Sequence, residues 1–265
     1  MIFLTYTGIA GMYLCQLSFD CLIDVEIDEV QPLISALLDE YRYNGQIIGR
    51  EFPLLINEGR FEALMVCPEQ DSLAVQFNNE KVTQSYQAIV DAGLALPEFA
   101  LKGLECQSDF SDICDQPGAY VLYSTYVQSC SPIRCMDHFS PVPLYKLPES
   151  CRKPLIKWQE SQAGCDQLQM NELIAMESAA VRQLSNHDSE LMAKGRQAID
   201  IITAKTHIPV YLYLYRVGGE SRELELKRKC PGCNSEWLLE QPMFGLFDFK
   251  CDVCQLVSNL SWDWQ

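Results

Sequence analysis

The stretch KCPGCNSEWLLEQPMFGLFDFKCDVC, residues 229–254, decides the fold of the C-terminal part of this chain. It contains two Cys-x2-Cys pairs with 17 residues between them, Cys230/Cys233 and Cys251/Cys254. Each pair can form a tight knuckle that directs two thiolates at one tetrahedral ion, and the spacing is typical of structural zinc sites. Pro231 and Gly232 suit the first knuckle, because proline fixes φ and glycine tolerates positive φ. We therefore predict a zinc ribbon with one structural Zn²⁺ held by these four cysteines.

Composition places the chain among folded, acidic proteins. Its 265 residues, 48% of them hydrophobic, can fill one large domain or two smaller ones. The formal net charge of −16 opposes binding to phosphate backbones and acidic membranes unless positive charge is segregated. Residues 230–265 contain one base, Lys250, and five acidic residues, and the one basic run, Lys227-Arg228-Lys229, comes just before them.

Cysteine usage favours a reducing compartment. Nine of the thirteen cysteines lie outside the predicted ribbon, scattered along the chain at positions 15, 21, 67, 106, 114, 130, 135, 151 and 165. A secreted disulfide scaffold is shorter and denser in cysteine, so we expect reduced, mostly buried thiols and a cytoplasmic protein. The apolar stretch 1–17 lacks a basic start and is too short and broken to span a bilayer. Because the strand pattern begins at Met12, we interpret residues 1–11 as an extension outside the fold.

The first hundred residues alternate between strand and helix patterns. Period-2 and helical spacing predict a strand over 12–19, a helix over 28–43, strands over 47–56 and 60–67, a helix over about 82–93 and a strand over 99–106. This β-α-β-β-α-β order is that of a ferredoxin-like αβ sandwich. It carries no Gly-rich phosphate loop and no paired-carboxylate motif, so we expect no chemistry from these elements.

The middle of the chain reads as a mixed region with long helices. We expect a strand over 119–128, an irregular proline-rich segment over 130–148, a helix over 155–169 started by Pro154, a long helix over 171–205 that breaks at Ser185-Asn186 or Gly195, and strands over 210–217 and 224–229. The predicted class is α+β, with domains over 12–106, 107–229 and 230–265. Because no flexible linker precedes the ribbon, we expect it to pack on the main body.

Several longer motifs carry a resemblance to a known family. They are PVPLY (141–145), WQ (158–159), CDQLQM (165–170), GR (195–196), PVYLYLYR (209–216), FDFKC (247–251) and SNLSW (258–262). Over about residues 12–265 the chain resembles a bacterial family of zinc-ribbon-containing proteins, described as nucleic-acid-binding but of uncharacterised function. The resemblance implies a bacterial cytoplasmic protein with a zinc ribbon. The description of nucleic-acid binding itself rests on the ribbon.

One position departs from the pattern of that family, which carries a second Cys-x2-Cys near Cys135. Here the second position is His138. Cys135-x2-His138 is therefore a candidate half of a second zinc site, which Cys130 or Cys151 could assist. The alternative is a pair of ordinary loop residues beside a proline-rich turn. We favour that alternative, because closed zinc sites need four ligands and no second pair stands out.

Three further groups of residues could carry chemistry or recognition. Cys165 and His187, oriented by Asp166 or Asp188, could form a nucleophile and its base, but the spacing matches no known signature and we expect ordinary helix residues. Tyr211 and its neighbours at 213 and 215 could stack on bases, although such a row is more often one face of a half-buried strand. The aromatic residues around the second knuckle, Phe244, Phe247, Phe249, Trp262 and Trp264, suit packing of a small ribbon, although exposed members could dock a protein partner.

These observations rank three functions. The first is a zinc-stabilised interaction or adaptor protein with a protein partner, no membrane contact and no catalytic residues. The alternative is a nucleic-acid-binding protein, whose contacts would come from the ribbon and from Arg216, Lys227, Arg228, Lys229, Tyr211 and Tyr213. The second alternative is an enzyme with a cysteine nucleophile. Metal catalysis at the ribbon is disfavoured, because four thiolates leave no open position for water.

Overall fold

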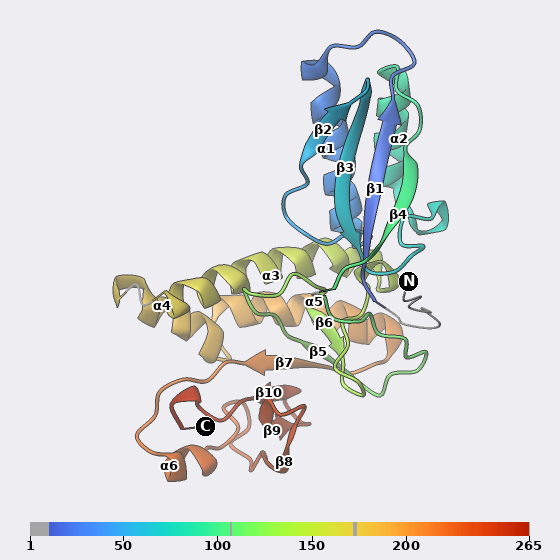
Figure 1. Cartoon of the computed structure of the whole chain (residues 1–265). Coiled ribbons are helices and arrows are strands. Elements are labelled where there is room, and N and C mark those ends of the chain that lie inside the picture. The colour runs from blue at the N-terminus through green and yellow to red at the C-terminus, as the bar shows by residue number, and fades with distance from the viewer. Residues whose placement is uncertain (1–10, 107, 172–173, 265) are drawn as a thin grey trace, which may run out of the picture. The chain divides into compact units, whose positions relative to one another are not determined.

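The computed structural model describes residues 11–106, 108–171 and 174–264, and its chain divides into two compact units (Figure 1). The first unit contains the described residues up to Ile113 together with 129–131 and 140–153. The second unit contains residues 114–128, 132–139 and the described residues from Pro154 onward. Both contain helices and strands, so the α+β class is confirmed. The expected N-terminal extension lies, up to residue 10, outside the described residues.

The first unit is a four-stranded antiparallel sheet with two helices. Its strands are β1 (Tyr13–Asp20), β2 (Leu54–Asn57), β3 (Arg60–Cys67) and β4 (Glu98–Leu104), and its long helices are α1 (Ile27–Asn44) and α2 (Glu80–Asp91). The strand order is β2-β3-β1-β4, with β1 between β3 and β4. Both helices lie on one face of the sheet (Figure 1). The β-α-β-β-α-β order expected from the sequence is confirmed for these residues.

Local chemistry sets the ends of these elements. Gly45 ends α1 in the left-handed region with φ 81°, where glycine costs little, as the Asn44-Gly45 signal predicts. Asn79 begins α2 by accepting a hydrogen bond from the Val82 backbone N–H at 3.0 Å. The strand expected over 47–56 is confirmed only from Leu54 onward, and over 47–53 the structure has just an isolated bridge between Ile48 and Val66. Gly49 has φ 129° there, and its carbonyl accepts a hydrogen bond from Arg42 instead of a ladder partner.

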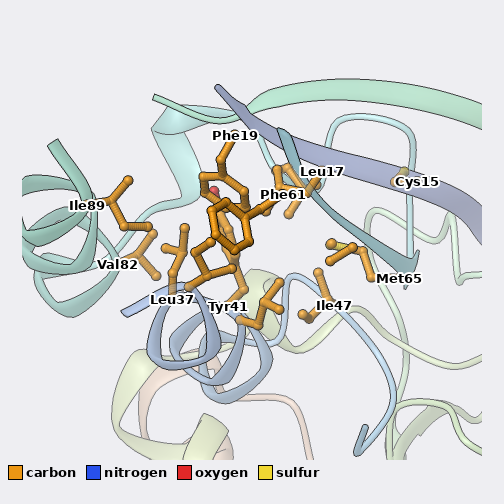
Figure 2. Packing of buried hydrophobic residues seen from close by; sticks show 14 of the residues in the cluster. Cys15, Leu17, Phe19, Leu37, Tyr41, Ile47, Phe61, Met65, Val82 and Ile89 are labelled. Atoms are coloured by element: carbon orange, nitrogen blue, oxygen red, sulfur yellow. The ribbon is translucent and has the colours of Figure 1, made fainter. Parts of the chain in front are cut away.

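One apolar core holds the first unit together. Phe19 and Phe61 point from the sheet toward Leu37 and Tyr41 of α1, and Val82 and Ile89 of α2 close the cluster (Figure 2). Cys15 and Cys67 are buried in the same cluster. Each large side chain removed from water here contributes about 1.5–3 kcal/mol, so this unit has an apolar source of stability that needs no metal.

A six-stranded mixed sheet forms the second unit. Its strands are β5 (Tyr120–Leu122), β6 (Ile133–Cys135), β7 (Val210–Leu214), β8 (Leu238–Met243), β9 (Phe247–Cys251) and β10 (Leu256–Ser258). The order is β6-β5-β7-β10-β9-β8, with β7 parallel to both β5 and β10. The strands that flank the second knuckle therefore continue the sheet begun by the middle of the chain. The β6 strand lies within the segment that the prolines predicted to be irregular.

The helices of the second unit confirm one expectation and correct two. The regular helices are α3 (Glu149–Met170, which starts in the first unit), α4 (Ile174–Ser185), α5 (Glu190–Thr206) and α6 (Arg222–Leu226), and short 3-10 turns span Val75–Phe77, Leu144–Lys146 and Trp262–Trp264. The break expected at Ser185-Asn186 is confirmed, and Ser189 caps α5. Pro154 lies inside α3 rather than at its start, since its fixed φ is compatible with a helix.

The strand predicted over 224–229 is wrong. Ser221 accepts a hydrogen bond from the Leu224 N–H at 3.3 Å, and this cap starts the short helix α6 in its place. The strand expected over 119–128 is confirmed only as the three residues of β5. Within the described ranges, no helix is long and apolar enough to cross a membrane.

Candidate metal centre

The four cysteines of the C-terminal motif converge in the second unit. Their Sγ atoms all lie within 4.8 Å of one another, and those of Cys233 and Cys251 are 3.5 Å apart. Tetrahedral zinc with Zn–S bonds of about 2.3 Å separates its sulfurs by about 3.8 Å. This set of thiols could therefore hold a metal ion with only small adjustments.

The two knuckles share a backbone feature that the sequence did not reveal. The residue after each second cysteine, Asn234 or Gln255, lies in the left-handed region, with φ 59° and 50°. In the first knuckle the Asn234 N–H donates to the Cys230 carbonyl at 2.8 Å. In the second the Cys254 N–H donates to the Cys251 sulfur at 3.4 Å. An N–H group directed at a sulfur, as in the second knuckle, favours the thiolate form that a metal needs.

Gly232 is needed for a different reason from the predicted one. It is absent from the positive-φ glycines of the described chain, so conformational freedom is not its role. A Cβ at this position would lie 2.8 Å from the Cys254 sulfur. Glycine is therefore required because the opposite knuckle approaches it closely. At Cys233, hydrogen bonding with Ser235, and then with Cys251, lowers the thiol pKa to about 6.

The basic residues proposed as nucleic-acid contacts are engaged inside the second unit. Arg216 donates from Nε to Glu225 Oε2 at 2.9 Å and pairs with the second oxygen of that carboxylate. Arg228 also faces Glu225, at 3.5 Å. Its guanidinium lies 4.8 Å from the Trp237 ring centroid and 4.4 Å from that of Phe249. Burial lowers the pKa of Arg228 to about 10, which marks it as an interior group.

The remaining predicted contacts are paired or buried as well. Lys227 bonds Glu223 at 2.6 Å, and Lys229 pairs with Glu236. In the tyrosine row, Tyr211 donates to Asp252 at 2.6 Å. Tyr213 donates to the buried Asn259 at 3.0 Å, and both tyrosines are buried in β7. The structure therefore places these residues close to the ribbon, but their polar atoms bind to other residues of the same unit.

The candidate nucleophile Cys165 lies on α3, and the candidate base His187 lies in the turn between α4 and α5. Cys165 is half-buried in α3, where burial raises the pKa of its thiol and favours the unreactive form. Asp166 accepts hydrogen bonds from Tyr126 N at 2.9 Å and from Gln169 at 3.2 Å. His187 pairs with Asp188 at 3.2 Å. Among the described residues, no hydrogen bond or ion pair joins Cys165 to His187.

A second cluster contains a residue that the sequence analysis missed. The ligand atoms of Cys114, Cys135 and His138 lie within 4.8 Å of one another. Cys114 takes the place considered for Cys130 or Cys151. It lies 21 residues before Cys135, and only the pairing of β5 with β6 brings the two segments together, so no local spacing could have indicated it.

The chain matches three models of protein families, each described as a domain of unknown function. They are DUF8589 over residues 12–103, DUF2310 over 114–215 and DUF8594 over 219–264. Among solved structures, it is similar to SnoaB, a cofactor-independent oxygenase from Streptomyces nogalater, at 11% identity and a TM-score of 0.29, over 36% of this chain and 95% of that one. A putative antibiotic biosynthesis monooxygenase from Caulobacter crescentus gives 12% identity and a TM-score of 0.30, over 37% of this chain and 92% of that one.

Two curated relatives, both from Haemophilus influenzae, are uncharacterized proteins. One is 45% identical over 64% of this chain and 85% of its own length. The other is 43% identical over 260 residues, which are 95% of this chain and 99% of that protein. A match of this extent and identity means that the chain belongs to the same bacterial family as this Haemophilus influenzae protein, a family whose members are uncharacterised.

Proposed function

We propose that this chain is a cytoplasmic adaptor whose C-terminal part is a zinc ribbon and whose partner is a protein. The observation that carries the proposal is the engagement of its basic residues. Arg216 and Arg228 share the buried carboxylate of Glu225, and each lysine of the run beside them has an acidic partner. A phosphate backbone would have to displace these carboxylates before it could bind.

The donor set supports zinc in a structural role. Four sulfurs at mutual distances within 4.8 Å suit a tetrahedral, thiophilic ion. A tetrathiolate site is closed, so it leaves no position for water or substrate. Its binding free energy would stabilise the two knuckles and hold strands β8 to β10 against the rest of the sheet.

Charge argues in the same direction. The whole chain carries −16, and residues 230–265 carry five acidic side chains against Lys250. Four thiolates with one Zn²⁺ would add a further net negative charge. Nucleic-acid binders gain most of their affinity when basic side chains release counterions from phosphates. The nucleic-acid alternative is therefore the weaker one, and the enzyme alternative is weakened at its candidate nucleophile Cys165, because burial raises the pKa of that thiol.

Exposed apolar side chains near the knuckles suit a protein partner. Val253, between the cysteines of the second knuckle, is 82% exposed. Phe244 and Trp262 are partly exposed, whereas Phe247 and Phe249 are fully buried. Contiguous exposed apolar surface is typical of docking sites, so these side chains are the first to test for contact with a partner.

Site-specific photocrosslinking tests the proposed partner. A photoreactive amino acid at Val253 or Phe244 is expected to give one discrete protein adduct in cells. The matched control places it at Glu240, an exposed position on β8 of the same ribbon, where no adduct is expected. Equal labelling at all three positions would contradict a defined docking surface.

Titration with labelled DNA and RNA at near-physiological salt tests the alternative. We expect no submicromolar binding, and no change in the double variant Lys227→Ala/Lys229→Ala, whose exposed side chains can be removed without disturbing the fold. Tight binding with a steep salt dependence that this variant abolishes would overturn the adaptor proposal.

A further inference from the structure

We propose that Cys114, Cys135 and His138 form a second zinc site, distinct from the four-cysteine ribbon. Their ligand atoms lie within 4.8 Å of one another, all in the second unit. The Cys135 sulfur is 3.9 Å from His138 Nδ1. A tetrahedral zinc bound to one thiolate and one imidazole separates these two atoms by about 3.6 Å. The cluster is thus already close to the geometry of a bound ion.

The backbone gives independent support, because residues 135–139 repeat the conformation of the ribbon knuckles. Phe139, which follows His138, has φ 59°, the value found at Asn234 after the first ribbon knuckle. Its N–H donates to the Cys135 carbonyl at 2.8 Å, as the Asn234 N–H does to Cys230. A phenylalanine in the left-handed region is unfavourable unless its surroundings require it.

An N–H···S hydrogen bond completes the likeness. The Asp137 N–H donates to the Cys135 sulfur at 3.4 Å, the same distance as the bond to Cys251 in the ribbon. A backbone donor aimed at a sulfur stabilises the thiolate and prepares it to bind a cation. The Cys135 segment therefore has the carbonyl bond of the first ribbon knuckle and the positive φ of both. Its sulfur accepts an N–H from two residues along the chain, where the Cys251 sulfur accepts one from three residues along.

The sheet holds the segment of Cys114 against this knuckle. Cys135 ends β6 and lies opposite Tyr120 of β5, and Met136 N–H donates to the Ala119 carbonyl at 2.9 Å. The Asp137 carboxylate accepts a hydrogen bond from the Gly118 N–H at 2.9 Å. These contacts fix the chain just after Cys114, so the third ligand is positioned by residues that are not ligands.

The site differs from the ribbon in its open side. Cys135 is buried, Cys114 is half-buried and His138 is exposed. Three protein ligands leave one tetrahedral position, which water or a donor atom from a small molecule can occupy, as in zinc sites that exchange a ligand. Binding would release the two thiol protons to solvent, because the metal takes thiolates. The inference does not depend on the ribbon and concerns different ligands.

The test is the zinc content of the purified full-length chain after dialysis against a weak chelator. We expect about two zinc ions per chain, and X-ray absorption that averages about three sulfur donors and one nitrogen or oxygen donor per zinc. His138→Ala and Cys114→Ser should each lower the content to about one and leave an all-sulfur spectrum. The matched controls His187→Ala and Cys106→Ser should leave both values unchanged.

The outcomes separate this proposal from the ribbon. Because His138 is exposed, its alanine variant should fold, and an unchanged circular dichroism spectrum will confirm that its lost zinc is a local effect. A wild-type content of about one zinc with only sulfur donors, unaffected by His138→Ala and Cys114→Ser, would overturn the second site. In Cys233→Ser, the X-ray absorption spectrum should lose only the all-sulfur component of the four-cysteine site. That result would confirm that the remaining zinc is bound at another site.

Discussion

The two units use cysteine in opposite ways. In the first unit Cys15 and Cys67 lie in the apolar core, where hydrogen bonding to Cys15 and burial raise the pKa of the Cys67 thiol. In the second unit the thiols of four cysteines face one another, and two further cysteines meet a histidine. The difference lies in the backbone: two thiols on neighbouring strands fill space, whereas knuckles bring enough donors together to bind an ion.

The difference extends to the source of stability. The core of the first unit is one cluster of buried apolar and thiol side chains from the sheet, both helices and the adjoining loops. The second unit also buries apolar side chains, such as Trp158, Ile202 and Leu212, but these lie on its helices and central strands, and the edge strand β8 is largely exposed. Strands as short as β10 cannot bury much surface, so the C-terminal strands should depend on a metal far more than the first unit does.

Removal of a ribbon ligand should have the largest effect. Cys233→Ser is expected to release the zinc and to cost several kcal/mol, because the free energy of zinc binding is folding free energy in such modules. Hydrogen exchange should show loss of protection in β8 and β9, with β1 and β3 unchanged. Cys106→Ser, an exposed thiol outside both clusters, is the control. If the amides of β9 stayed fully protected from exchange in the metal-free variant, the C-terminal strands would not depend on the metal more than the first unit does.

A core substitution in the first unit should have the converse effect. Phe19 is fully buried, so Phe19→Ala should lower the free energy of unfolding by about 3–5 kcal/mol through lost burial and a cavity. Its zinc content should stay at the wild-type value. Phe99→Ala on β4 of the same sheet is the matched control, and it should cost much less because Phe99 is 45% exposed. Urea unfolding and elemental analysis measure the two quantities.

The sequence predicted the first unit better than the second for a physical reason. Its helices and long strands span enough residues to show a period, as in Val30, Ile34 and Leu37 of α1 or the alternation along β3. In the second unit β5, β6 and β10 have three residues each, too few for alternation to be distinguished from chance. The segment over 224–229 has no clear period either, and the Ser221 cap decided it in favour of a helix.

The candidate sites divide in the same way. The four ribbon cysteines could be predicted because each pair is local in sequence and forms its own knuckle. Cys114 could not, because its neighbourhood to Cys135 depends on pairing between β5 and β6. The roles of Arg216 and Arg228 could not be predicted either, since a sequence does not show which carboxylate a basic residue will pair with.

The ion pairs at Glu225 offer a test of intermediate size. Glu225→Gln replaces an acceptor by an amide whose N–H groups face the guanidinium of Arg216, so we expect a loss of about 1–3 kcal/mol in the stability of the second unit. Glu223→Gln on the same helix is the control, because its exposed pair with Lys227 is worth about 0–1 kcal/mol. Equal effects of the two variants would show that burial at Glu225 does not matter.

The smallest expected effect is a pH dependence at Tyr215, the residue that directly follows β7. Burial, and then the negative charge of Asp166, raise the pKa of Tyr215 to about 12. The unfolded chain should titrate this hydroxyl near pH 10. Because the folded pKa is the higher one, the stabilising contribution of the neutral hydroxyl is complete below about pH 10 and is lost as the pH rises through about 12.

Tyr215→Phe isolates that contribution, since every other titrating group cancels in the comparison with the wild type. At neutral pH the variant should lose about 0.5–1.5 kcal/mol, because it lacks the hydrogen bond from the Tyr215 hydroxyl to Gln169. Between about pH 10 and 12 only the wild type has a half-buried phenol that ionises more easily in the unfolded chain. The difference in free energy of unfolding between wild type and variant should therefore narrow over this range. Urea unfolding at several pH values measures this difference. A difference that stays constant up to pH 12 would mean that Tyr215 titrates alike in both states, and that the second unit is open to water where the structure shows it packed.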